Sequence, residues 1–240
     1  ASDVYKRQDT TRTTSAVTGY PVDGPVTNAS ATVYAVDFSG GSASKGSAID
    51  SGSTNGSAAL TGLEIDDTTE GFVIVEVVAT DTTIDLTTGL PPVIRTLRTA
   101  ISAEGLKAGQ RVYATPMTTM AVNMALNDAS ATDGASFSQA LGRAANQVAS
   151  TVGFGIGSEV DIFKTPPLLD DSVDTPEKAQ ATLNYRVATQ AMATVLHNMQ
   201  HDLDDGDAGT EDPDADAILT ALAEDLSDGL IDGSANGTDS

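Results

Sequence analysis

The sequence contains no cysteine and no tryptophan, and only 4% of its 240 residues are aromatic. The absence of cysteine excludes disulfides and cysteine-ligated zinc or redox sites. Because aromatic side chains are scarce, Val, Ile, Leu, Ala and Met must fill the core. A hydrophobic content of 40% is sufficient for such a core, in one large domain or in two ordinary ones.

Basic residues are also few: 12 Lys and Arg stand against 34 Asp and Glu, which gives a net charge of −22. A surface of this sign repels phosphate backbones and anionic lipid headgroups, so we expect no nucleic-acid partner. The longest apolar run, Phe72 to Ala79, is interrupted by Glu76 and is far shorter than a membrane span. We therefore also expect no direct membrane insertion.

The first eight residues, ASDVYKRQ, resemble the translation of a common transposase sequencing adapter at every position. We therefore expect residues 1–14 to be an adapter-derived, disordered tail, and the natural N-terminus to lie upstream. Residues 234–240 have the composition of a linker, which indicates that the chain is also truncated at its other end.

Between Ser15 and Thr115, short runs rich in Val, Thr, Ile and Tyr alternate with turn residues. Residues 72–78 are the most continuously apolar of these runs and are predicted to form the central strand. Residues 39–57 contain few large apolar groups, which predicts a mobile loop around one short strand. The pattern predicts an antiparallel β-sandwich, transthyretin-like or Ig-like, over residues 15–115.

After Thr115 the apolar period becomes helical and predicts four helices. The first is capped by Thr115, the second runs from about Ala135 to Val152, the third starts after Asp174 or Thr175, and the fourth follows residues 210–216. The apolar stripe predicted for the third helix comprises Leu183, Val187, Ala191, Val195 and Met199, widened by Ala188, Met192 and Leu196. Residues 116–233 are therefore predicted to be a C-terminal α-helical domain, and the fold class to be α+β.

The only histidines, His197 and His201, lie four residues apart and can chelate a metal from one helix face. Residue 198 is Asn and not the Glu of a zinc peptidase, and Gly206 falls where an EF-hand loop needs an oxygen ligand. Two interpretations stay open. One is a solvated acidic loop after histidines that the helix dipole favours. The other is a divalent-cation site, with Ca²⁺ as the candidate ion, formed by His197, His201, Asp202, Asp204, Asp205 and Asp207.

The motifs of catalysis are missing from the sequence. It contains no Gly-x-Ser-x-Gly elbow, and two histidines on one helix leave few options for a catalytic triad. The glycine-rich residues 153–157 lack the Lys-Ser/Thr pair of a phosphate loop and are interpreted as a helix end. Six carboxylates are interpreted as solvated turn residues because nothing apolar nearby would raise a pKa: Glu64, Asp66, Asp67, Glu70, Asp81 and Asp85. We predict neither an enzyme nor a resident cofactor.

Residues 18–37, TGYPVDGPVTNASATVYAVD, followed by residues 51–63, SGSTNGSAALTGL, resemble the carboxypeptidase-regulatory-like, transthyretin-like β-sandwich modules of bacterial surface proteins. The P-G-x-Y segment of these modules is replaced by residues 67–75 here. Later segments resemble secreted or lipid-anchored proteins of marine bacteria, in which such a sandwich precedes a helical region. The resemblance is carried by Asp23, Gly24, Pro25, Val26, Ala31, Thr54, Gly56 and Leu63.

This resemblance implies a non-enzymatic structural or adhesive module of a cell-surface or secreted protein. It implies an extracellular or outer-surface location, with a possible lipid anchor upstream, and an extracellular protein or glycan as partner. The alternative from the residues themselves is a divalent-cation (calcium) or small-ligand binding protein that uses the acidic C-terminal region.

Overall fold

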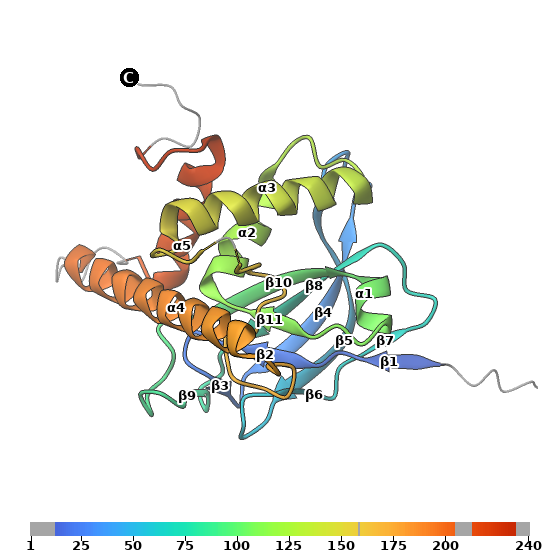
Figure 1. The fold of residues 1–240 in the computed structure, drawn as a ribbon. Coiled ribbons are helices and arrows are strands. Elements are labelled where there is room, and N and C mark those ends of the chain that lie inside the picture. Colours follow the sequence, from blue (N-terminus) through green and yellow to red (C-terminus); the bar gives the residue numbers. More distant parts are fainter. Residues whose placement is uncertain (1–12, 158, 205–212, 234–240) are drawn as a thin grey trace, which may run out of the picture.

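The computed structural model describes residues 13–157, 159–204 and 213–233 (Figure 1). It confirms the α+β class, with 37% helix, 25% strand and antiparallel sheets. None of the helices in these ranges is long and apolar enough to cross a membrane.

The main sheet has five antiparallel strands in the order β10-β8-β4-β5-β6. Its register places Val33 of β4 opposite Val75 of β8, and Val75 opposite Thr99 of β10. The apolar run predicted to be central is β8, which is an interior strand beside the central β4. The strands are β4 (Ser30–Asp37), β5 (Ser44–Thr54), β6 (Leu60–Thr61), β8 (Phe72–Val78) and β10 (Thr96–Ser102).

Strand β5 corrects the prediction of a loop with one short strand over residues 39–57, because it is 11 residues long. It pairs with β4 from Ser30↔Ser53 to Asp37↔Ser44, with two shifts in register. Only Thr54 at its end is buried. Backbone hydrogen bonding to β4 therefore stabilises this strand. Its small polar side chains have low strand propensity, so the sequence alone does not predict it.

Short strand pairs complete the β part, and one of them is parallel, contrary to the prediction of antiparallel strands only. A helix of five residues, which the sequence did not predict, lies between β10 and β11: α1 (Ala103–Lys107). The pairs are β1 (Thr14–Ala16) with β7 (Glu64–Asp66), β3 (Val26–Thr27) with β9 (Ile84–Asp85), and the parallel β2 (Gly19–Pro21) with β11 (Val112–Ala114).

The long helices of the described residues begin within two residues of their predicted starts, and the last of them begins at Ala215, inside the segment 210–216 that was predicted to precede it. Thr115 caps α2 through a capping box with Thr118, and Thr175 caps α4 ahead of Pro176. Gly153 ends α3 as predicted. The helices are α2 (Pro116–Asn127), α3 (Gly134–Val152), α4 (Pro176–Leu203) and α5 (Ala215–Asp225), with a 3₁₀ turn η1 (Leu226–Asp228) after α5.

Helix α2 joins the strands to the other helices. Ten of its 12 residues are buried, and its Thr118 Oγ1 donates a hydrogen bond to Arg98 O at 2.7 Å. The Arg98 amide in turn donates to Thr119 Oγ1 at 2.8 Å. One continuous cluster of buried side chains includes Leu97 of β10 and Met192 of α4. The core therefore extends across residue 115, and the domain boundary there stays a prediction.

The buried face of α4 differs from the predicted stripe. Leu183, Val187 and Val195 are 50%, 64% and 39% exposed. The face that packs inward is centred on Tyr185, whose hydroxyl is 2.8 Å from Thr115 Oγ1 and donates to Ile162 O at 2.9 Å. The predicted stripe is wrong in part, because Tyr185 takes the inward position and turns the branched side chains outward. The remaining buried residues of α4 are Ala181, Thr182, Ala188, Thr189, Met192 and Leu196.

Candidate functional site

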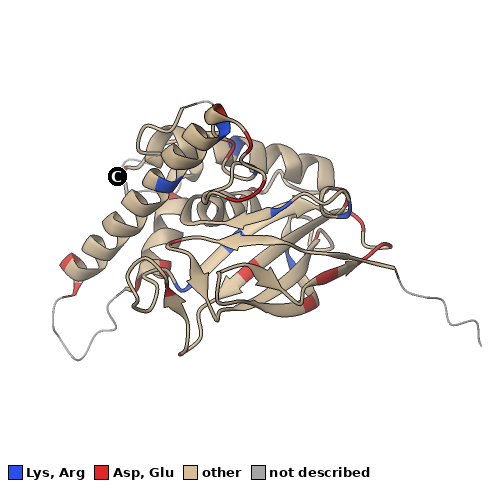
Figure 2. Ribbon diagram, turned by 60° about the horizontal axis from the view of Figure 1, so that its bottom comes forward, with Lys and Arg blue, Asp and Glu red and all other residues tan. Residues whose placement is uncertain are grey.

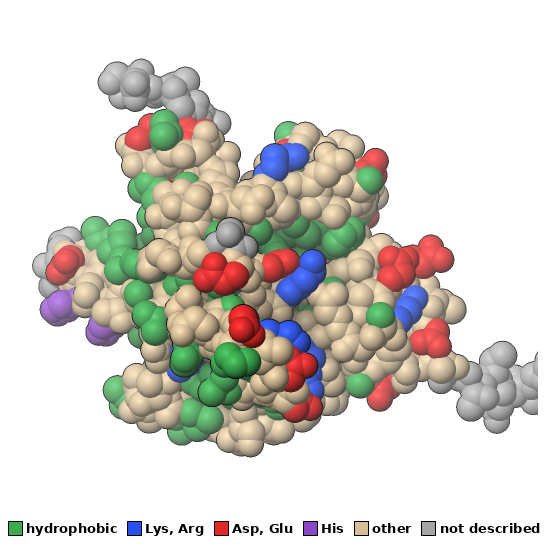
Figure 3. Space-filling model, in the orientation of Figure 1, with side chains coloured by type: hydrophobic (Ala, Val, Ile, Leu, Met, Phe, Trp, Pro, Cys, Tyr) green, Lys and Arg blue, Asp and Glu red, His purple; other side chains and the backbone are tan. Residues whose placement is uncertain are grey.

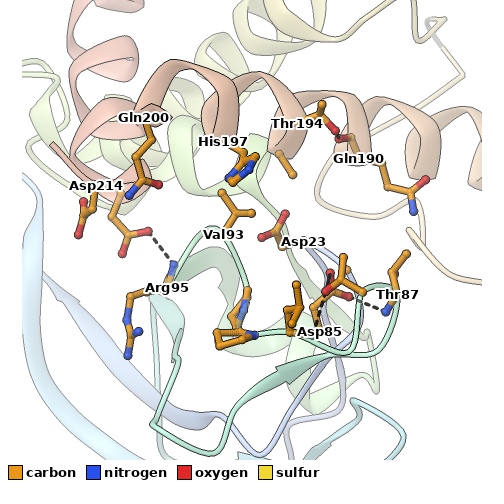
Figure 4. Close-up of a pocket in the computed structure, with 17 residues that line it drawn as sticks. Asp23, Asp85, Thr87, Val93, Arg95, Gln190, Thr194, His197, Gln200 and Asp214 are labelled. Carbon is orange, nitrogen blue, oxygen red and sulfur yellow. Dashed lines mark hydrogen bonds between the residues drawn. The ribbon is translucent and has the colours of Figure 1, made fainter. Parts of the chain in front are cut away.

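A cavity of about 730 Å³ lies between one side of α4, the chain from Asp85 to Arg95, and the start of α5 (Figure 4). Helix α4 places polar and small side chains on it at helical spacing, and residues 90–93 supply an apolar wall. The residues from α4 are Gln190, Ala193, Thr194, His197 and Gln200, and those of the apolar wall are Leu90, Pro91, Pro92 and Val93.

Asp23 contributes a buried carboxylate to the cavity wall. It is 3% exposed, its Oδ2 accepts a hydrogen bond from the Ile94 amide at 3.1 Å, and its Oδ1 has no hydrogen-bond partner among the described residues. Burial, together with the negative charge of Asp85, raises the pKa of Asp23 from 3.8 to about 6, although the Ile94 hydrogen bond opposes the rise. A buried carboxylate oxygen without a partner is uncommon and is typical of functional sites.

Asp85 is the second buried carboxylate, with 8% of its surface exposed. Its Oδ1 accepts from the Thr87 amide at 2.7 Å and its Oδ2 from Thr88 Oγ1 at 3.3 Å. A Cβ atom on Gly24 would lie 1.6 Å from Asp85 Oδ1, so only glycine at residue 24 allows this approach. The interpretation of Asp85 as a solvated turn residue was wrong, because the turn at residues 23–24 packs over it.

Arg186 of α4 is a cation whose positive charge acts on both Asp23 and Asp85. Its Nη2 donates to Thr87 Oγ1 at 2.9 Å, whereas its buried Nη1 has no hydrogen-bond partner in the described part of the chain. Burial lowers the pKa of Arg186, and the charges of Asp85 and Asp23 oppose that change. The charge of one guanidinium therefore acts on two carboxylates, and Asp23 Oδ1 and Arg186 Nη1 each stay without a hydrogen-bond partner among the described residues.

The start of α5 brings two further carboxylates. Asp214 caps the helix by accepting from the Ala217 amide at 2.8 Å, and Asp216 Oδ1 accepts from the Arg95 amide at 2.8 Å. Burial raises the pKa of Asp216. The Arg95 guanidinium points away from the cavity in Figure 4, toward Ala79 O at 3.5 Å. The cavity is therefore bordered by an excess of negative charge.

The structure places one residue of the predicted cation site, His197, on this cavity. His197, His201, Asp202 and Asp204 are all exposed near the end of α4, where Figure 3 shows both histidines at the surface. Asp205 and Asp207 lie outside the described residues. In the described part of the chain, no three His, Asp or Glu side chains come together in a way that could hold a metal ion. The calcium site stays a prediction.

A buried carboxylate on the main sheet, Glu76, has a structural role, because it is fully paired with basic side chains. Glu76 of β8 is 6% exposed and accepts from Arg98 Nε at 2.7 Å and from Lys45 Nζ at 3.1 Å. Arg98 Nη1 also donates to Asn123 of α2 at 2.8 Å. Burial alone would raise the pKa of Glu76, but these hydrogen bonds outweigh it and hold the pKa below its ordinary value. In Figure 2, acidic and basic positions both occur on the strands of this sheet. Glu76 thus has its partners, whereas Asp23 lacks one.

No protein-family model matches the chain, and no curated protein matches it. The resemblance to transthyretin-like modules therefore stays a prediction. Four of the residues that carry it, Val26, Ala31, Thr54 and Leu63, are buried in the β part of the structure. Asp23, from the same motif, instead lines the cavity.

Sequence reasoning missed most of this site. In the sequence, Asp23 stands out only as a motif residue, and Arg186 and Asp216 belong to no motif. One available signal was Arg186 itself, since it is the last basic residue of the chain and lies beside Tyr185 in an apolar helix. An arginine is almost never buried without a carboxylate partner. Its position therefore predicts acidic neighbours from elsewhere in the chain.

Proposed function

We propose that this chain is a non-enzymatic binding module of a bacterial secreted or cell-surface protein, and that the cavity beside α4 is its small-ligand site. The observation that carries the proposal is the buried Asp23 carboxylate, with one oxygen unpartnered, in the wall of a cavity of about 730 Å³. A cavity of this size, mostly apolar with a few convergent polar groups, is typical of small-molecule sites.

The energetics of Asp23 support a role in binding over a role in folding. Burial makes the ionised carboxylate costly, as its raised pKa indicates. An uncharged side chain of the same shape would stabilise the folded state more, and residues that are kept at a cost to stability are concentrated at functional sites. Glu76 shows that this same fold supplies full pairing where a buried carboxylate has a structural role.

The proposal also covers the fold family of the chain, its location and its larger partner. We place the β part in a transthyretin-like sandwich family and residues 116–233 in a helical domain beside it, and we place the whole on the outer surface of a bacterium or outside it. The motif residues Val26, Ala31 and Leu63, which are buried in or beside antiparallel strands, support the family, and the net charge of −22 is compatible with a saline exterior. An extracellular protein or glycan is the proposed larger partner.

The test of a small-ligand site is thermal denaturation of the full chain against a library of small molecules. Ligands that bind the folded state raise the melting temperature. We expect Thr194→Trp, which fills the cavity from α4, to abolish the shift caused by any hit. Asn198→Trp places the same side chain on an exposed position of α4 that does not line the cavity, and should preserve the shift. Hits that survive Thr194→Trp, or a library without hits, would contradict the proposal.

A further inference from the structure

We infer that the ligand of this cavity is a small linear organic cation with at least two amino groups, a diamine or polyamine, which its carboxylates bind at both ends. This inference rests on the proposed small-ligand site and names the ligand class. It follows from the placement of charge, apolar surface and one unpartnered carboxylate oxygen around one cavity.

The carboxylates occupy two ends of the cavity. Asp23 and Asp85 approach it from the β part, and Asp214 and Asp216 approach it from the start of α5. Figure 4 shows Asp85 and Asp214 on opposite sides of the view, with Val93 between them. Two separated anionic groups match two separated ammonium groups on one ligand.

The surface between these ends is suited to an alkyl chain. Residues 90–93 contribute Leu, Pro, Pro and Val, and Ala193 faces them from α4. No Phe, Tyr or Trp occurs among the described residues that line the cavity, so a sugar ring would have no aromatic ring to stack on. Burial of methylene groups against such a surface favours binding.

The sign of the local charge selects a cation. Among the described residues, four carboxylates line the cavity, and the one guanidinium that does so, Arg95, is directed away from it. Arg186, which does not line the cavity, compensates part of the charge of Asp23 and Asp85. His197 on α4 is the remaining titratable group on the cavity. An anionic ligand would meet repulsion here, whereas an ammonium group is attracted.

Asp23 offers the specific contact. Its Oδ1 is buried, with almost no surface of its own exposed, and has no hydrogen-bond partner among the described residues. An ammonium group that reaches this oxygen would supply the missing donor. A charge-assisted bond of this kind is roughly twice as strong as a neutral one. Because only the ionised carboxylate attracts a cation, binding should release the Asp23 proton at acidic pH.

The test is isothermal titration calorimetry of the full chain with 1,4-diaminobutane and with spermidine. We expect saturable binding with one site at pH 7.5, weaker binding of butylamine, and an affinity about tenfold lower at pH 5.0 because Asp23 must first lose its proton. Asp23→Asn should reduce the affinity at least tenfold. Asp81→Asn removes the same charge from an exposed turn that does not line the cavity, and should leave binding unchanged.

The outcomes separate this inference from the proposed site. Amine binding that Asp23→Asn and Asp81→Asn weaken equally would show only non-specific attraction to an acidic protein, and would overturn the inference. So would tighter binding of CaCl₂ than of both amines, or a neutral or anionic library hit that Thr194→Trp abolishes; the latter would leave the small-ligand site standing. Circular dichroism of each variant confirms that loss of binding is not loss of folding.

Discussion

Asp23 and Glu76 are two buried carboxylates with opposite pKa shifts. The pKa of Asp23 is raised because burial dominates, and the pKa of Glu76 is lowered because Arg98 and Lys45 pair with it. Glu76 therefore contributes stability that is present above its ordinary pKa and is lost as the pH falls through the lowered value. Asp23 has the opposite effect on stability, because it binds a proton more tightly in the folded protein than in the unfolded chain.

We predict that Asp23→Asn stabilises the protein at pH 8, by up to about 3 kcal/mol, from the shift of 3.8 to about 6. The folded wild type holds more protons than the unfolded chain between these two values, so its stability falls as the pH rises through that window and stays lower above it. The Asp23→Asn variant has no titratable group at this position and therefore does not lose stability in this window. The difference should become small near pH 3.5, where Asp23 is protonated in the folded state and mostly protonated in the unfolded chain.

Urea denaturation at pH 3.5 and at pH 8 measures this difference. Asp81→Asn is the matched control, because it removes one carboxylate from an exposed turn and should change the free energy of unfolding little at either pH. An Asp23→Asn variant that is less stable than wild type at pH 8 would mean that Asp23 stabilises the fold. It would contradict the claim that the buried carboxylate lowers stability and serves ligand binding.

At the scale of elements, α4 connects the cavity to the core. One face carries Gln190, Thr194 and His197 on the cavity, and another carries Tyr185 and Met192 into the core. Tyr185 is fully buried and ties α4 to the start of α2 through Thr115 and to the chain before α4 through Ile162. The orientation of α4, and with it the cavity wall, depends on this hydroxyl.

We predict that Tyr185→Phe lowers the free energy of unfolding by about 1–3 kcal/mol, because it leaves the Ile162 carbonyl and the Thr115 hydroxyl without this partner. Chemical denaturation measures the effect. Tyr34→Phe is the control, since the Tyr34 ring lies under Lys45 but its hydroxyl makes no hydrogen bond within the described residues. Equal effects of the two substitutions would show that the Tyr185 hydroxyl does not hold α4.

Some elements were predictable from sequence and others were not. Thr115-Pro116 and Thr175-Pro176 carry local capping signals, so the starts of α2 and α4 were predicted correctly. Strand β5 was missed because its pairing with β4, not its Gly- and Ser-rich composition, makes it a strand. The face of α4 was misjudged because the inward direction depends on where Tyr185 finds hydrogen-bond partners, in chain segments far away.

At the scale of the whole molecule, the cavity unites parts of the chain that are distant in sequence. Asp23, Asp85, His197 and Asp216 all line it and come from a turn, a strand, and two helices. No spacing rule relates these residues, so the local patterns in the sequence could not assemble them. The predicted metal residues, in contrast, were neighbours in sequence, and the described ones lie exposed at the end of α4.

The net charge of −22 makes specificity the central question for any cationic ligand, because an acidic protein attracts cations everywhere on its surface. Screening by salt weakens such diffuse attraction between exposed charges, whereas it weakens contacts inside a buried site much less. The proposed site is therefore distinguished by where a cation binds and not only by whether it binds.

The most direct test is a nuclear magnetic resonance titration of the ¹⁵N-labelled chain with 1,4-diaminobutane at 0.15 M salt. We predict saturable shifts in the amides of Ile94, Thr87 and Arg95, which hydrogen-bond to Asp23, Asp85 and Asp216. The amide of Ser130, which bonds to Asp128 away from the cavity, serves as the internal control and should not move. Shifts that are spread over the acidic turns without saturation, or no shifts at all, would contradict the account.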